Sequence, residues 1–149
     1  MQIRATPKEM GLVFRRLANT LEPAVRAAER ESGEEALKVA QELSSGPYTS
    51  AMLKALGHPY ATRAPNPPQD AGVINRQLGE FYNSWRLRAP RRVGTVMRTR
   101  LVNVSYHAAF LEKGTRLMIA RPIKEAIATR MENTRRKIMR RHLKTWARG

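Results

Sequence analysis

Side chains able to carry acid–base or metal chemistry are few and scattered in this sequence. The three histidines, His58, His107 and His142, are not paired at metal-ligand spacing. The absence of cysteine excludes a thiolate metal site and a disulfide framework. The acidic residues beyond position 45 are too dispersed in sequence to support a two-carboxylate or two-metal site: Asp70, Glu80, Glu112, Glu125 and Glu132. We therefore expect no enzyme, no metal and no cofactor, and a small nuclease would lack the site that it needs.

The chain has a large excess of basic residues, with 28 Lys and Arg against 12 Asp and Glu and a net charge of +16. Residues 1–45 hold seven basic and seven acidic residues, so the rest holds 28 − 7 = 21 basic and 12 − 7 = 5 acidic residues. This second part is expected to contact nucleic acid or an acidic protein surface. The alternative is a solvated surface that keeps the protein soluble.

The first element that must position these groups is a long N-terminal helix, expected from about residue 7 to 44. Thr6 and Glu9 have the spacing of a capping box at its start. Pro23 is expected to kink or break the helix, because its ring clashes with the preceding turn. Gly33 is a second candidate interruption.

A proline-rich stretch follows, between short helices expected at residues 48–56 and 73–82. Residues 57–72 contain four prolines, which favour polyproline II or irregular structure. A loop of this length is either an extended arm that lies on a neighbouring subunit or a flexible insertion. The candidate arm residues are His58, Pro59, Tyr60, Pro65, Pro67 and Pro68.

Two strands with a two-residue period are expected at residues 84–89 and 95–104, joined by a turn at 90–94. The core-facing set is Trp85, Leu87, Ala89, Met97, Thr99 and Leu101. The opposite set is Arg86, Arg88, Arg98 and Arg100. Four like charges destabilise a sheet unless an anion lies nearby. Val102 and Val104 share the parity of the arginines, which indicates a bulge or a partly covered outer face.

The last element is a basic helix expected over residues 121–147. Its apolar stripe is Ile123, Ala126, Ile127, Met131, Thr134 and Ile138. Another side carries Arg136, Lys137, Arg140 and Lys144, which join the hairpin arginines as the candidate surface for DNA or a protein partner. Met139, Leu143 and Trp146 lie away from the stripe and are candidates for contact with a neighbour.

The stretch 106–123 joins the hairpin to this helix through an aromatic-rich run that ends in Glu112. Gly114 permits a positive φ after a short helix, Thr115 restarts an extended segment, and Pro122 suits the first helical turn. The ordered set Glu112, Gly114, Thr115 and Pro122 resembles the tail-completion (head–tail joining) family of tailed bacteriophages, closely over the C-terminal third. Glu112 either caps or pairs locally or, as the resemblance implies, buttresses the loop.

The resemblance implies a structural virion protein of the neck, assembled in the host cytoplasm. Such proteins form homo-oligomeric rings, commonly six-fold, around the DNA channel. The implied partners are other neck, portal-side or tail-tube proteins, together with non-specific contact with packaged DNA. No apolar run approaches the ~18 residues that a membrane span requires, so no membrane contact is expected.

The alternative is a basic, non-specific nucleic-acid-binding protein outside a virion. An aromatic content of only 6% gives no stacking platform, and the basic helix lacks a helix-turn-helix partner. Phosphate contact is therefore supported, whereas base reading is not. In either case we expect one α+β domain over residues 1–149, with long N- and C-terminal helices on a small antiparallel sheet and an extended proline-rich loop.

Overall fold

The computed structural model describes residues 7–46, 74, 79–116 and 120–148. The expected cap at Thr6, the helix at 48–56 and the proline-rich arm lie outside the described residues. The helix expected at 73–82 is described only in part, as α3 (Glu80–Asn83).

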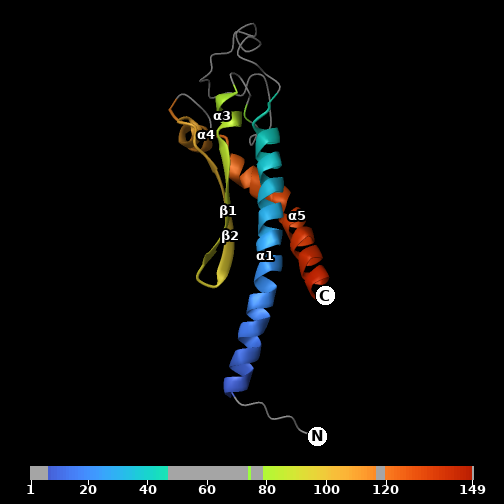
Figure 1. Cartoon of the computed structure of the whole chain (residues 1–149). Coiled ribbons are helices and arrows are strands. Elements are labelled where there is room, and N and C mark those ends of the chain that lie inside the picture. Colours follow the sequence, from blue (N-terminus) through green and yellow to red (C-terminus); the bar gives the residue numbers. More distant parts are fainter. Residues whose placement is uncertain (1–6, 47–73, 75–78, 117–119, 149) are drawn as a thin grey trace.

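The described fold has three layers. Helix α1 (Pro7–Leu43) lies between a β-hairpin on one side and helix α5 (Ile123–Trp146) on the other (Figure 1). The hairpin pairs β1 (Trp85–Val93) with β2 (Val96–Asn103) in an antiparallel sheet, and α3 and α4 (Ala108–Lys113) lie near its open end. The expected α+β class, with long terminal helices and a small antiparallel sheet, is confirmed.

Helix α1 continues through Pro23, so the predicted break does not occur, whereas a kink there stays a prediction. Pro23 removes one backbone donor, which would have bonded the carbonyl of Asn19 four residues earlier. Both residues are exposed, so water can satisfy the carbonyl that Pro23 leaves free. The helix ends at Leu43, where the backbone of Ser44 donates to the Ala40 carbonyl at 3.0 Å, as the end signal at residue 44 predicts.

Gly33 does not interrupt α1 either, and its role is to admit the hairpin. A Cβ at this position would lie 2.5 Å from Thr99 Cγ2 and 2.8 Å from Leu87 Cδ1. Real Cβ contacts are longer than this, so any side chain here would push the hairpin away from α1. The glycine therefore sets the distance between these two layers.

The hairpin differs from its predicted form at Pro90. The predicted turn at residues 90–94 is wrong, because β1 continues through a buried Pro90 to Val93 and the turn is Gly94-Thr95, with φ 62° at Gly94. The pairing Arg88↔Arg100 is followed by Arg91↔Arg98, so β1 has one extra residue beside Pro90. This β-bulge turns Ala89 out to solvent in place of its predicted core position.

The core lies at the upper end of α1 in Figure 1, where the three layers meet. Its buried side chains are Ala40, Leu43, Ile74, Phe81, Trp85 and Ile123. The Trp85 indole N–H donates to Ser44 Oγ at 2.9 Å, and that hydroxyl donates to the Ala40 carbonyl at 2.6 Å. The predicted stripe of α5 is also confirmed, with Ile123, Met131 and Ile138 buried.

Candidate functional site

The outer face of the hairpin carries five exposed arginines, which we call the arginine face: Arg86, Arg88, Arg91, Arg98 and Arg100. Arg88 lies directly opposite Arg100, and Arg91 lies directly opposite Arg98. Directly opposed residues project from the same side of a sheet, and like charges in this arrangement destabilise it. The four predicted arginines are therefore brought together, and a fifth joins them.

The bulge beside Pro90 places Arg91 in this set. Without the extra residue, strict alternation would point Arg91 towards α1 and Arg92 outwards. With it, Arg92 pairs with buried Met97 and reaches the Glu22 carboxylate of α1 at 3.3 Å. Sequence reasoning missed Arg91 because it assigned residues 90–94 to the turn.

The arginine face has little internal compensation. Arg86 Nη1 donates to the carbonyls of Asn83 at 2.7 Å and Trp85 at 2.9 Å. Within the described part of the chain, no carboxylate forms an ion pair with any arginine of this face. Its positive charge is therefore available to an external anion.

The glutamates of α1 are used to hold the layers together. Glu29 is buried; its carboxylate accepts a 2.7 Å bond from Arg135 of α5 and a 3.3 Å bond from the Thr99 backbone of β2. Its own carbonyl accepts from Thr99 Oγ1 at 2.9 Å. Sequence reasoning counted α1 as a balanced scaffold and missed this role.

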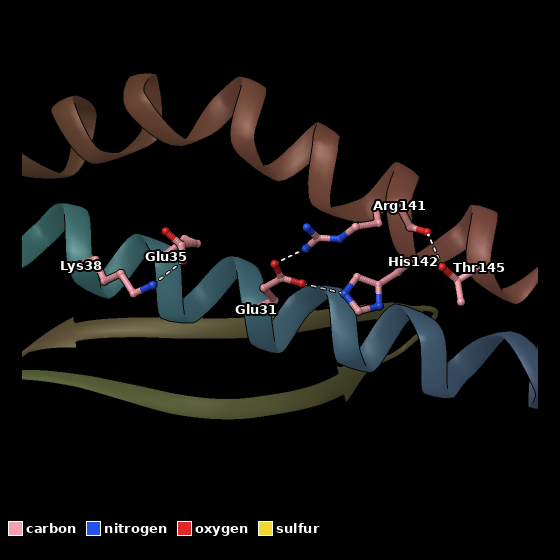
Figure 2. Close-up of polar contacts among 6 residues, drawn as sticks. All are labelled: Glu31, Glu35, Lys38, Arg141, His142 and Thr145. Atoms are coloured by element: carbon pink, nitrogen blue, oxygen red, sulfur yellow. Dashed lines mark hydrogen bonds and ion pairs between the residues drawn. The ribbon is translucent and has the colours of Figure 1, made fainter.

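Glu31 makes a second link to α5. Figure 2 shows its carboxylate between Arg141 and His142, with one oxygen directed at each. The contact with His142 Nε2 is 2.8 Å. Hydrogen bonding from Arg141, and then from His142, holds the pKa of the Glu31 carboxyl below its usual value. His142 is therefore a structural residue of the α1–α5 contact.

The predicted basic side of α5 is exposed, at Arg136, Lys137, Arg140 and Lys144. Arg136 forms an ion pair with Glu132, four residues earlier on α5, at 2.8 Å. Next to these residues is a shallow open groove, which we call the α5 groove. Its lining residues all come from α5 and include half-buried Met139 and Leu143, buried Met131, and the exposed charged residues Glu132, Arg135, Arg136, Arg140 and Lys144. Trp146 is half-buried and does not line this groove.

The residues of the turn between α4 and α5 end one helix and cap the next. Gly114 ends α4 with φ 73°, which confirms the predicted positive φ. Glu112 accepts from the backbone N–H of Lys124 at 3.4 Å, so it caps the first turn of α5. Pro122 is the N-cap residue of α5, which begins at Ile123, whereas the prediction placed Pro122 within the first helical turn. Thr115 is exposed in the segment between the two helices.

Arg121 completes this turn. Its backbone N–H donates to the Leu111 carbonyl at 2.7 Å and ties the start of α5 to α4. Burial lowers the pKa of its guanidinium. Through these contacts, Glu112 and its neighbours position the start of α5.

The described residues bring no metal-binding group together. His107 lies 3.7 Å from Glu80 at the surface, and the part of the chain that the structure describes contains no cluster of three or more potential ligands. The candidate arm residues, including His58, lie outside the described part. Nor does any described helix have the length and apolar character to cross a membrane.

Comparison with known proteins identifies no relative. No protein-family model, curated protein or solved structure matches this chain.

Proposed function

We propose that this chain is a structural subunit of the neck of a tailed phage, where it forms a homo-oligomeric ring that joins head to tail around the DNA channel. The resemblance of the 106–123 stretch to tail-completion proteins suggests the family. The geometry of that stretch supports it, because Gly114, Glu112 and Pro122 act together to start α5.

The observation that carries the proposal is the projecting N-terminal half of α1. In Figure 1 this blue part of the helix extends beyond both the hairpin tip and the C-terminal end of α5. Met10, Leu12 and Leu17 on it are 47%, 52% and 46% exposed. A lone helix of about 15 residues is marginally stable in water, so contact of these exposed apolar side chains with another molecule would stabilise this segment.

We assign the occupant of this contact to a second copy of the chain, because a homo-oligomeric ring requires a contact between copies. The acidic residues of the other half of α1 do not supply that contact, since Glu22, Glu29, Glu31 and Glu42 pair with cations of the same chain. Head-to-tail contacts between copies generate a ring when the rotation closes.

The α5 groove supplies a second contact, to a different protein. It combines apolar side chains with an excess of cationic ones, a mixture that suits a protein interface. The complementary occupant is an amphipathic acidic segment of a neighbouring neck, portal-side or tail-tube protein. In this arrangement the protein resides in the virion.

Measurement of mass by sedimentation, for the protein alone and with purified tails, tests the proposal. Wild type should form a closed ring under at least one condition. Leu12→Gln/Leu17→Gln should remain monomeric with an unchanged unfolding temperature, because these side chains contribute little to the monomer core. Val93→Gln/Val96→Gln is the matched control: these side chains are 50% and 48% exposed at the hairpin tip and should not affect the ring.

The second candidate function is a nucleic-acid-binding protein outside a virion, favoured by the uncompensated arginine face. Such a protein would show no ring at any concentration, with or without tails. That result together with tight DNA binding would replace the neck proposal.

A further inference from the structure

We infer that the arginine face of the hairpin is a binding site for the phosphate backbone of double-stranded DNA, distinct from the basic side of α5. The inference does not depend on the neck proposal, because it rests on the hairpin alone.

The first argument is the density of charge. Arg88 with Arg100 and Arg91 with Arg98 form two rungs of directly opposed like charges. Opposed residues are about 5 Å apart, and positions two residues apart on one strand are separated by about 6.8 Å. Four cationic side chains therefore originate from a very small area, without a carboxylate partner in the described residues. An external polyanion offsets their mutual repulsion.

The second argument is the identity of the cations. Each basic residue of the hairpin, from Trp85 to Asn103, is arginine rather than lysine. The planar guanidinium donates two parallel hydrogen bonds to a phosphate, whereas lysine acts as a point charge. A surface that only maintained solubility would gain nothing from this choice.

The third argument separates DNA from an acidic protein. Protein interfaces place apolar anchors at the centre and charges at the rim. The arginine face has the reverse arrangement: charged rungs occupy its centre, and Val93 and Val96 lie at one end with Val102 at the other. The charged centre of the hairpin thus suits a phosphate backbone, and the α5 groove suits a protein.

The fourth argument concerns the form of the nucleic acid. A two-stranded ribbon fits the major groove of B-DNA, which is about 12 Å wide and has phosphates along both edges. The outer face has no aromatic side chain on which an unpaired base could stack, since Trp85 is buried in the core. The face also presents no Asn or Gln to read adenine. Arginine can read guanine as well as bind phosphate, so the inference is confined to the phosphate contacts, which do not depend on sequence.

Fluorescence anisotropy with a labelled duplex of arbitrary sequence, titrated at several salt concentrations, tests the inference. The test variant replaces Arg88, Arg91, Arg98 and Arg100 by Gln. The matched control replaces Arg136, Lys137, Arg140 and Lys144 by Gln, which removes the same charge from α5.

The hairpin variant should bind at least about tenfold more weakly at 0.1 M salt, and its slope of log K against log salt should fall by up to about 3.6, or 0.9 for each lost phosphate contact. The α5 variant should keep its slope within about one unit of wild type. The hairpin variant should also unfold at the same or a higher temperature, because like charges are removed.

Three results would overturn the inference. The first is an equal weakening of duplex binding by both variants, which would indicate an effect of total charge. The second is a loss of duplex binding in the α5 variant alone, and the third is binding of polyglutamate by the arginine face as tightly as the duplex. If the fourfold hairpin variant does not fold, Arg88→Gln/Arg100→Gln against Arg136→Gln/Arg140→Gln makes the same comparison. Rings without duplex binding would refute this inference alone, and duplex binding without rings would refute the neck proposal alone.

Discussion

Gly33 is the residue whose replacement the structure constrains most sharply. Gly33→Ala gains about 1 kcal/mol of helix propensity, but its Cβ would meet Thr99 Cγ2 at 2.5 Å. We expect a net loss of about 1–3 kcal/mol in the free energy of unfolding, measured by denaturant titration. Gly11→Ala is the matched control, because no atom lies within 4 Å of its Cβ, and it should stabilise the protein by up to about 1 kcal/mol. A stabilising Gly33→Ala would show that the two layers are not in close contact.

Glu31 gives the α1–α5 contact a pH dependence. Arg141 first, and His142 second, lower the pKa of this carboxyl below its ordinary value of 4.5. A lowered folded-state pKa adds stability that is complete above the unfolded pKa and disappears as pH falls through the folded one. The stability difference between wild type and Glu31→Gln should therefore be present at about pH 6, shrink below about 4.5 and vanish in stronger acid. Glu34→Gln, at an exposed position on the same helix, is the control for the removal of one carboxyl charge.

For single residues, the sequence predicted only the roles that depend on neighbours in the chain. The positive φ of Gly114 follows from a glycine after a short helix, and the sequence contains that information. The role of Gly33 depends on Thr99 and Leu87, which approach it from another layer. The same limit applies to Glu29, whose partners lie 70 and 106 residues away in the chain.

Among the elements, the two strands of the hairpin and most of its core-facing residues were predicted correctly, but its turn and its bulge were not. Two-residue alternation identified Trp85, Met97 and the outward arginines correctly. A bulge was one interpretation of the parity of Val102 and Val104, but its position beside Pro90 was not predicted. A proline within a strand pattern was assigned to a turn, whereas a bulge or an edge strand also accommodates proline. The break at Pro23 was wrongly predicted for a related reason, since an exposed helix surface tolerates a missing backbone bond.

The joining of elements through α1 can be tested at Glu29. In Glu29→Gln the amide has one acceptor oxygen, so either Arg135 or the Thr99 N–H would face a donor. We expect a loss of about 1–3 kcal/mol in unfolding free energy, by denaturant titration. Glu34→Gln, at an exposed position on the same helix, should change it by less than about 0.5 kcal/mol. Equal effects of the two variants would contradict the linking role of Glu29.

For the whole molecule, the division into a neutral and a cationic part was correct as a count but incomplete as a description. Glutamates of the neutral part pair with cations of the other part, as Glu29 does with Arg135 and Glu42 with Arg130. Among the described residues, the arginine face and Lys137, Arg140 and Lys144 of α5 take part in no ion pair with a carboxylate. A sequence count cannot show this, because it does not know which charges the fold brings together.

The layer order also makes α1 a lever. Glu22 is held by Arg92 of the hairpin, so the segment that can move as a free arm begins beyond Glu22. From Glu22 to Pro7 the helix measures about 22 Å at 1.5 Å per residue. A rotation of only about 10° at Glu22 would therefore move the free end by about 4 Å. A small displacement of the hairpin would thus be magnified at the N-terminal end of α1.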